Sequence, residues 1–278
     1  MIIKGKEVSE KIRQKFIDDN KGKDFKLAIL RLGNRPEDLS YERGLIANCK
    51  KLGLEYEVLA YQDNISTEEL KLELDRVNKD ASITGAILFR PLPKHIDMDV
   101  RNYLDPNKDL DCMTSSNLAK VLEFREGLYP ATALATLEFL KYYKIDLVGK
   151  SVVIINSSLV FGRPLSLMLM KEKATVTVCN SKTEDLSKYT LNADIVISAI
   201  GKAKIHKENN FKSDACLIDI GISKDENGDL SGDFDMDFLQ DKVKYISPAI
   251  GGVASVTSAI LVSQLALAKE LQDKTKRV

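Results

Sequence analysis

The chain has 278 residues, of which 44% are hydrophobic and 29% are charged, with 41 basic and 41 acidic side chains. This composition excludes a disordered, collagen-like or coiled-coil protein, and the length predicts two domains that each bury a core. The balanced charge, with a pI near 6.8, provides no general attraction to nucleic acid or to an anionic membrane, so we expect neither as a partner.

The sequence predicts a cytoplasmic protein. Charged side chains interrupt residues 1–19, unlike the apolar core of a signal peptide. The longest apolar stretches, such as 259–268, fall short of the ~20 residues that span a bilayer, so no membrane span is expected. Four widely spaced cysteines without a C-x-x-C pair favour buried free thiols over disulfides, and no metal site is expected.

The first 120 residues alternate between helical and strand patterns, which is typical of an α/β layer. We predict helices over 8–17, 40–52 and 66–78, and strands over 26–32, 55–61 and 85–89. Gly53 closes the second helix, because glycine readily adopts the left-handed conformation found there. A loop is expected at Asn34-Arg35-Pro36, and Pro91 follows the third strand because proline cannot continue a β-ladder.

The second half predicts a nucleotide-binding sheet. Apolar, β-branched runs at 151–155 and 174–179 flank a turn and a helix over 164–170, with the spacing of a right-handed βαβ unit. Strands over 194–199 and 216–220 extend the same parallel sheet. The domain border is expected near a helix over 132–143.

Ligands of such sheets bind beyond the carboxyl ends of the strands, which directs attention to the segments that follow them. At 156–162, the N–H groups of a helix start can hold a phosphate, and Asn156 replaces the usual first glycine because asparagine tolerates positive φ. A plain strand-to-helix turn is an equally good interpretation. Gly251-Gly252 permit close approach to a flat ligand, or form a tight turn without one.

Two further segments carry ionisable groups. Tyr41 is expected in the first turn of its helix, where a nearby cation would let it act as a general acid or base, but Leu45 occupies the next turn. The alternative is an amphipathic tyrosine at a domain edge. Lys108-Asp109-Leu110-Asp111 either places a carboxylate in a cleft or forms an acidic surface turn, and the surface turn is favoured on these residues alone.

A set of short motifs lies along nearly the whole chain in a fixed order. They are Tyr41 with Gly53, Pro91-Leu92-Pro93, Lys108-Asp109-Leu110-Asp111 with Asn117, Gly149-Lys150, Ser158 with Gly162 and Pro164, Ser181-Lys182-Thr183, Ile218-Asp219-Ile220-Gly221, Gly232-Asp233, and Gly251-Gly252-Val253. Together they resemble the methylenetetrahydrofolate dehydrogenase/cyclohydrolase family, the FolD proteins.

The resemblance implies a two-domain α/β fold, with an α/β substrate domain over 1–120, a Rossmann-like NAD(P) domain over 121–278 and a folate cleft between them. The last helix, over 256–271, is expected to pack back on the first domain. Members of the family oxidise 5,10-methylenetetrahydrofolate with NADP or NAD, and many then hydrolyse the methenyl product. A homodimer is also implied.

The resemblance also implies the residues of the site. Tyr41 and Asp111 match the catalytic positions. Substrate binding falls on Tyr41, Phe89, Pro91, Leu92, Asp111, Gly251 and Gly252. Cofactor binding falls on Asn156, Ser157, Ser158, Gly162, Ser181, Gly201, Ile222 and Thr257.

Several residues depart from the family pattern. Leu45 stands where the family has a catalytic lysine, and Phe89, next to Arg90, replaces a glutamine. Because ring opening needs proton transfer, we predict that the cyclohydrolase step is weak or lost, whereas hydride transfer survives. Ser157 replaces an arginine that meets the 2′-phosphate of NADP, which favours NAD or relaxed specificity.

An alternative is a catalytically silent relative that binds a folate, a nucleotide or a partner subunit. Its basis is that the departures cluster around both ligands. Because Leu45 and Phe89 are apolar where the family is polar, a pocket for a less polar ligand is a further hypothesis.

Overall fold

The computed structural model describes residues 1–207 and 210–275, and the chain divides into two compact units. The first, which we call the five-stranded unit, comprises Met1–Lys11 and Thr132–Thr257. The second, the three-stranded unit, comprises Ile12–Ala131 and Ser258–Val278. Each unit has its own parallel sheet and is described by itself.

This division differs from the border expected after residue 120. The first eleven residues, Met1–Lys11, group with the second half of the chain. The reason is backbone pairing: the Ile3 N–H donates to the carbonyl of Ile246 at 2.9 Å, and the Gly5 N–H donates to the carbonyl of Gly251 at 2.8 Å. The other change of unit falls between Ala131 and Thr132.

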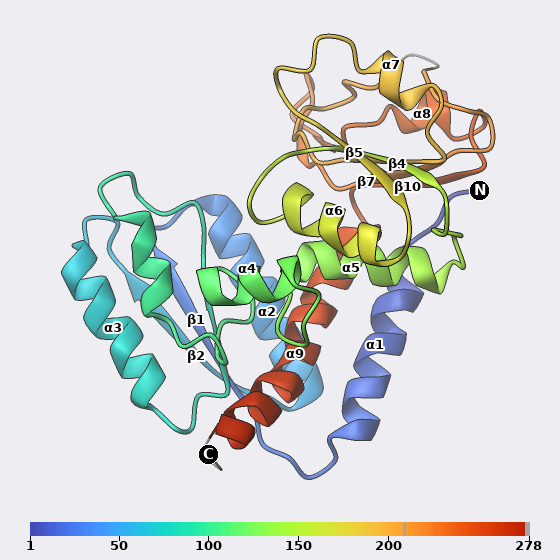
Figure 1. Ribbon diagram of the computed structural model, residues 1–278. Helices are drawn as coiled ribbons and strands as arrows, with labels where there is room; N and C mark the ends of the chain where they lie inside the picture. The colour runs from blue at the N-terminus through green and yellow to red at the C-terminus, as the bar shows by residue number, and fades with distance from the viewer. Residues whose placement is uncertain (208–209, 276–278) are drawn as a thin grey trace. The chain divides into compact units, whose positions relative to one another are not determined.

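The three-stranded unit is built on a parallel sheet with the strand order β2-β1-β3 (Figure 1). Its elements are β1 (Lys26–Leu32), α2 (Pro36–Leu52), β2 (Glu55–Tyr61), α3 (Thr67–Lys79), β3 (Gly85–Leu88), the 3-10 helix η1 (Met98–Tyr103) and α4 (Ser115–Leu122). The chain runs from β1 out to β2 and back past β1 to β3, so right-handed crossovers place α2 and α3 on opposite faces of the sheet. The predicted strands β1 and β2 are confirmed at both ends.

Helix α2 begins earlier than the sequence predicted. The expected loop at Asn34-Arg35-Pro36 is wrong at its last residue, because Pro36 is the first residue of the helix and Arg35 is its N-cap. Proline suits this position, since its missing N–H would have no partner in the helix. Tyr41 consequently lies in the second turn of α2 and not in the first. Gly53 ends the helix with φ 66°, as predicted.

Helix α3 shows how local sequence fixes an element. The Ser66 hydroxyl accepts from the Glu69 N–H, and the Glu69 carboxylate accepts from the Ser66 N–H at 2.8 Å, which completes a capping box. Leu70, Leu74 and Val77 recur at helical spacing and are fully buried in the core of the unit. The predicted helix over 66–78 is therefore confirmed.

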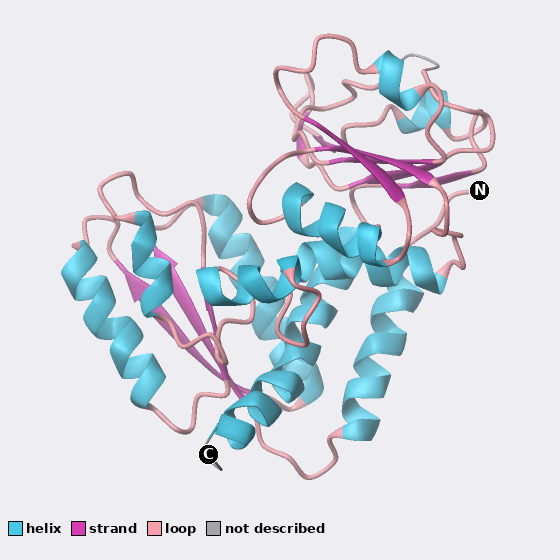
Figure 2. Ribbon diagram, in the orientation of Figure 1, coloured by secondary structure: helices cyan, strands magenta, loops and turns pink. Residues whose placement is uncertain are grey.

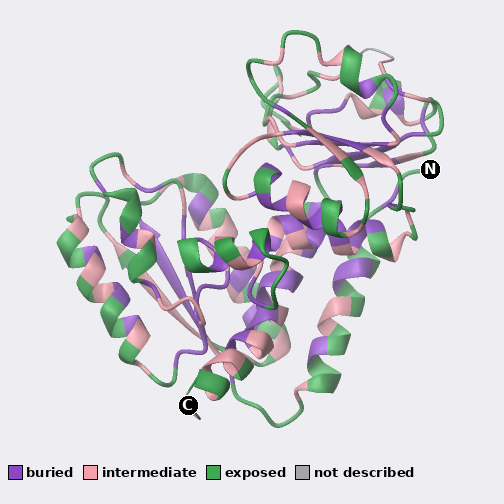
Figure 3. Ribbon diagram, in the orientation of Figure 1, coloured by how far each residue is buried: buried purple, intermediate pink, exposed green. Residues whose placement is uncertain are grey.

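The five-stranded unit contains a fully parallel sheet, whose strands are magenta in Figure 2. The strand order is β10-β7-β6-β4-β5. Its strands and their connecting helices are β4 (Ser151–Ile155), α6 (Gly162–Lys171), β5 (Thr175–Cys179), α7 (Ser187–Thr190), β6 (Ile195–Ser198), β7 (Cys216–Asp219), α8 (Met236–Leu239) and β10 (Tyr245–Ser247). Strands β4, β6 and β7 are buried almost throughout (Figure 3). A short antiparallel pair, β8 (Ser223–Lys224) and β9 (Leu230–Ser231), lies outside the sheet.

The strand order reverses between β4 and β6. The chain runs from β4 to the edge strand β5 and then returns past β4 to β6, β7 and β10. Loops after β4 and β6 diverge at this switch point, and the crevice between them is where doubly wound sheets bind ligands. The elements that sequence analysis missed, such as α7, α8 and β8, are too short to show a clear hydrophobic period.

Three long helices include residues of both units: α1 (Lys6–Asp19), α5 (Ala131–Tyr142) and α9 (Val253–Thr275). Helix α9 is longer than predicted and, by length and composition alone, is apolar enough to cross a bilayer. However, 56% of its most apolar part is buried within the protein.

A buried glutamine on α9 identifies it as a core helix. The Gln264 side-chain amide donates to the carbonyls of Leu110 and Tyr129, at 2.7 and 3.0 Å. Its oxygen accepts from the Tyr129 N–H at 2.8 Å. Gln264 is only 4% exposed, so these backbone groups have no water to replace it.

Replacing Gln264 should therefore destabilise the three-stranded unit. Gln264→Leu leaves three backbone groups without their partner, and we expect the free energy of unfolding to fall by about 2–4 kcal/mol. Urea denaturation followed by circular dichroism measures this. Gln14→Leu is the matched control, because Gln14 is exposed on α1, where its amide donates to Asp18 at 3.2 Å. Equal losses in the two variants would contradict the structural role of Gln264.

Candidate active site

Tyr41 and Phe89 lie together in the three-stranded unit. Tyr41 is on α2, and Phe89 follows β3 directly. Their ring centroids are 5.2 Å apart and the rings are tilted by 37°. Tyr41 is half-buried, whereas Phe89 is only 4% exposed. Two residues of the predicted substrate set are thus in direct contact.

The Tyr41 hydroxyl is held in its protonated form. Burial raises the pKa of Tyr41 well above its ordinary value, and the negative charge of Asp111 raises it further. Arg90 lowers this pKa, but its effect is smaller than that of burial. At neutral pH the phenol is therefore a hydrogen-bond donor and acceptor, and not a base.

The two apolar replacements, Leu45 and Phe89, add little exposed surface. Leu45 is fully buried, and Phe89 nearly so. Leu45 lies one turn beyond Tyr41 on α2, and the Phe89 ring packs against the Tyr41 ring. Neither side chain offers accessible apolar surface to a ligand.

The segment Lys108–Asp111 contains two buried structural residues, Lys108 and Asp109, and one partly exposed carboxylate, that of Asp111. Lys108 is 3% exposed, and its ammonium donates to the carbonyls of Val77, Asn78 and Asp80, at 2.7–2.9 Å, at the C-terminus of α3. This arrangement satisfies the last carbonyls of the helix and complements its dipole. The favoured interpretation as a surface turn is therefore wrong for Lys108.

Asp109 is also buried and holds the start of α4. Its carboxylate accepts from the backbone N–H groups of Met113 and Thr114, at 3.0 and 2.8 Å, and from the Asn117 amide at 3.2 Å. Burial raises the pKa of Asp109, and the N–H donors oppose that shift. Asp109 thus fixes the backbone that follows Asp111.

Asp111 points to a different partner. Its carboxylate lies 2.5 Å from the guanidinium of Arg90, and each side chain is 21% exposed. Of the neighbouring predicted residues, Pro91 is exposed, whereas Leu92 packs in the core of the unit. The structure therefore brings Tyr41, Phe89 and Asp111 together around Arg90, a residue that was not in the predicted set.

In the five-stranded unit, Asn156 spans the switch point between β4 and β6. Its side-chain amide donates to the Ala199 carbonyl at 2.8 Å, and its oxygen accepts from the N–H groups of Ser158 and Gly162, at 2.8 and 3.2 Å. Asn156 does not have the positive φ that we expected. It shapes the turn through its side chain and not through a left-handed backbone.

The start of α6 is closely packed, and the N–H groups of its first two residues already have acceptors: Asn156 Oδ1 for Gly162 at 3.2 Å and the Ser158 carbonyl for Arg163 at 3.1 Å. A Cβ atom at Gly162 would lie 1.8 Å from the Asn156 carbonyl oxygen, so only glycine fits. The N-cap residue, Phe161, makes no side-chain capping bond. Arg163, in the first turn, donates to the Ser157 carbonyl at 2.9 Å. Sequence analysis missed Arg163, although a cation beside a predicted phosphate turn is a visible signal.

The remaining predicted cofactor residues lie on loops of the same unit. Ser181 is exposed in the turn after β5, where Asn180 accepts from the Lys182 N–H at 2.9 Å. Ile222 is 43% exposed after β7, and Thr257 lies half-buried in the second turn of α9. These residues come from three different connections of the sheet.

Gly201 is held by a buried carboxylate. Asp233 accepts from the backbone N–H groups of Ile200, Gly201 and Lys202, at 2.7–2.9 Å, and from the Ser198 hydroxyl at 2.7 Å. The Ser198 hydroxyl is also 3.0 Å from His206 Nε2. Burial lowers the pKa of His206, which is therefore neutral at pH 7. The loop after β6 is thus built around Asp233.

Asp219 supports Asp233 in turn. Its carboxylate accepts from the N–H groups of Asp233 and Phe234, at 3.1 and 2.9 Å. Burial raises the pKa of Asp219 to about 7, and the N–H donors oppose this shift.

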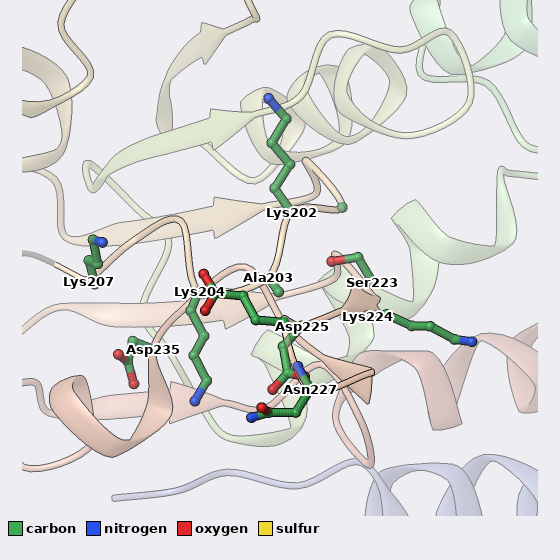
Figure 4. Close-up of a pocket in the computed structure, with 11 residues that line it drawn as sticks. Lys202, Ala203, Lys204, Lys207, Ser223, Lys224, Asp225, Asn227 and Asp235 are labelled. Carbon is green, nitrogen blue, oxygen red and sulfur yellow. The ribbon is translucent and has the colours of Figure 1, made fainter. Parts of the chain in front are cut away.

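A cavity of about 610 Å³ opens beside this loop (Figure 4). Gly201 borders it, together with four lysines and three acidic residues: Lys202, Lys204, Lys207, Lys224, Asp225, Glu226 and Asp235. The mixed charge of the lining does not select one sign of ligand. The cavity therefore gives no basis for a separate anion site beside Gly201.

The two glycines of the predicted substrate set belong to the five-stranded unit, apart from Tyr41 and Asp111 in the other unit. Gly251 has φ 79°, which L side chains rarely adopt. A Cβ atom at Gly252 would lie 2.0 Å from the Pro248 carbonyl oxygen. Both residues are therefore required by the tight turn that opens α9.

The fold and these residues define a two-unit α/β protein with a doubly wound parallel sheet of the dinucleotide-binding type. The model of the tetrahydrofolate dehydrogenase/cyclohydrolase catalytic domain matches residues 3–111, and that of the NAD(P)-binding domain of the same family matches residues 130–273. The chain belongs to the tetrahydrofolate dehydrogenase/cyclohydrolase family.

Known relatives match the chain over nearly its full length. The bifunctional protein FolD of Clostridioides difficile is 44% identical, over 98% of this chain and 97% of that protein. The FolD crystal structure from Campylobacter jejuni is 33% identical, with a TM-score of 0.93 over 98% of this chain and 99% of that one. The Trypanosoma brucei FolD structure, complexed with NADP and an inhibitor, is 27% identical, with a TM-score of 0.92 and 98% coverage of both chains.

The raised pKa of Asp219 predicts a pH-dependent stability. Between about pH 4 and pH 7 the unfolded chain ionises Asp219, whereas the folded chain keeps its proton. The free energy of unfolding should therefore fall as the pH rises through this window, by up to ~1.4 kcal/mol per pH unit.

Urea denaturation of the wild type and of Asp219→Asn at several pH values tests this. The variant lacks the titrating group, so its stability should fall less steeply with pH, whatever its absolute stability. Asp214→Asn, at an exposed position of the same unit, is the control. Parallel curves for the wild type and Asp219→Asn would show that Asp219 does not titrate in this range.

Proposed function

We propose that this protein oxidises 5,10-methylenetetrahydrofolate to 5,10-methenyltetrahydrofolate with NAD or NADP. The observation that carries the proposal is the match of a folate-catalytic model and an NAD(P)-binding model to successive parts of one chain, 3–111 and 130–273. The retained Tyr41 and Asp111 in the first part, and the turn after β4 in the second, support it.

The turn after β4 fits a dinucleotide. The turn lies at the switch point between β4 and β6, beyond the carboxyl end of β4, which is where doubly wound sheets bind dinucleotides. Asn156 holds this turn beside the loop after β6, which carries Gly201. We propose that Asn156, Ser157, Ser158 and Gly162 hold the phosphates, and that Ser181, Gly201, Ile222 and Thr257 contact the rest of the cofactor. When bound, NAD(P) supplies the hydride acceptor.

In the three-stranded unit, we propose that Asp111 accepts hydrogen bonds from the amino-pyrimidine edge of the folate ring. A carboxylate is an acceptor only, which suits the two donors on that edge. The protonated Tyr41 hydroxyl offers a donor close by, and the Phe89 ring fixes the orientation of the Tyr41 ring. We propose that Pro91, Leu92, Gly251 and Gly252 complete the substrate contacts through backbone and ring surface.

The same residues favour oxidation over hydrolysis. Hydride transfer chiefly needs two reacting carbons held in contact, whereas opening the methenyl ring needs an activated water and proton transfer. Leu45 supplies no proton, and the raised pKa of Tyr41 keeps it from acting as a base. We propose that hydrolysis of the methenyl product is weak or lost.

Cofactor choice follows from the turn residues. Ser157 supplies no cation for a 2′-phosphate, and the Arg163 side chain is bonded to the Ser157 carbonyl. The Arg163 guanidinium, held at the Ser157 carbonyl, can lie beside either dinucleotide and does not select strongly for NADP. We propose relaxed specificity between NAD and NADP.

We further propose that the protein works in the cytoplasm as a homodimer joined through its five-stranded units. All four cysteines are buried and free, which suits a reducing compartment. Strand β5 is an edge strand, and Val178 on it is 39% exposed, which leaves an edge that a second copy can cover.

The proposed function predicts a specific pattern of activities. The purified protein should convert 5,10-methylenetetrahydrofolate to the methenyl form, with rates for NAD and NADP within about tenfold of each other. Methenyl hydrolysis should be about 10²–10⁴-fold slower than in a bifunctional relative such as the C. difficile FolD. Absorbance of the reduced cofactor and of acid-quenched methenyl product measures both steps.

The outcomes separate the alternatives. Folate or nucleotide binding by calorimetry without any turnover would support a catalytically silent binding protein. Hydrolysis as fast as in the C. difficile protein would contradict the loss assigned to Leu45. A preference for NADP of more than a hundredfold would contradict relaxed specificity.

A further inference from the structure

The Asp111 carboxylate already has a partner inside the protein. Arg90 Nη2 lies 2.5 Å from Asp111 Oδ2, and the two side chains are equally exposed, at 21%. Such a pair is neither on the open surface, where it would be weak, nor deep in the core. A ligand that takes both oxygens of the Asp111 carboxylate therefore competes with the Arg90 guanidinium for Oδ2.

Arg90 is not fully satisfied where it lies. Its Nε atom is buried and has no hydrogen-bond partner among the described residues. Arg31, in the same unit, shows the contrasting structural case. Its Nε donates to Glu42 at 2.7 Å, its Nη1 donates to Asn34 at 2.7 Å and to the Gly33 carbonyl, and its side chain is 8% exposed. A buried unpaired donor costs free energy. Moving the Arg90 side chain out of its position therefore costs less free energy than moving Arg31.

The Arg90 guanidinium and a tetrahydropterin ring would both donate hydrogen bonds to Asp111. The guanidinium only donates hydrogen bonds. The amino edge of a tetrahydropterin, from which Asp111 would accept hydrogen bonds, also only donates. A ring edge that donates to both oxygens of the carboxylate needs Oδ2, to which Arg90 Nη2 already donates. We propose that Arg90 is a built-in competitor for Asp111, which swings away when the folate ring binds and so weakens folate affinity.

This inference rests on the proposed function, because it takes the ligand of Asp111 to be a folate ring. The surroundings of the pair fit displacement. Arg90 stands on the segment after β3, with Phe89 and Leu92 buried on either side of the exposed Pro91. The Arg90 side chain therefore has an anchored backbone and a partly open path to solvent.

The test removes the competitor and measures binding. Arg90→Leu should tighten binding of 6-methyltetrahydropterin and of tetrahydrofolate by about fivefold each, measured by calorimetry. In the oxidation assay, KM for methylenetetrahydrofolate should fall by a similar factor with little change in kcat, as expected for a gain of ground-state and transition-state binding alike.

Two variants serve as controls. Arg90→Lys keeps a cation and should stay within about twofold of the wild type. Arg76→Leu removes the same charge from α3, where Arg76 pairs with Glu73 at 3.1 Å and Glu57 at 3.4 Å, and should change neither affinity. In addition, Asp111→Asn should weaken pterin binding more in the Arg90→Leu background than in the wild type.

The pterin probe distinguishes the possible results. Unchanged or weaker binding of both probes by Arg90→Leu would overturn the inference, and so would a loss confined to tetrahydrofolate, which would place Arg90 on the glutamate tail. Turnover without a change in KM would leave the proposed function standing and overturn the inference. Tighter pterin binding without turnover in any variant would support the inference and contradict the proposed reaction.

Discussion

Buried carboxylates hold the loops that follow the parallel strands, because the N–H groups beyond the end of a strand have no ladder partner. In the five-stranded unit Asp233 takes the N–H groups of the loop after β6, and Asp219 takes those around Asp233. In the three-stranded unit Asp109 does the same for the segment before α4. Burying such charges is costly, and several N–H donors per carboxylate offset that cost.

The bonding of buried charged groups to loop backbone separates the residues that hold the loops from those that line the site without holding a loop. Asp109, Asp233 and Lys108 are tied to backbone atoms, so changing them alters the loops themselves. Leu45 and Arg90 are outside these networks. A chain of this family can therefore change the chemistry around Tyr41 while its loops and sheets keep their positions.

The sequence was sufficient to predict most strands, because parallel strands buried on both faces are continuous apolar runs, as at 26–32 and 151–155. It was insufficient where a side chain's partner is distant in the chain. Lys108 reads as part of a polar turn, yet it caps a helix that ends about thirty residues earlier. The pairing of Arg90 with Asp111 is equally invisible, because no local pattern links positions that the sheet brings together.

The position of one cation explains how the site differs from the family pattern. Where the resemblance expects a lysine one turn after Tyr41, Leu45 is buried, and the cation that lowers the Tyr41 pKa is Arg90. Arg90, however, makes its short contact with Asp111 and not with the phenol. Its charge therefore neutralises the carboxylate more than it activates Tyr41, whose pKa stays raised. A cation at the strand end therefore forms an ion pair with Asp111 and leaves the phenol protonated.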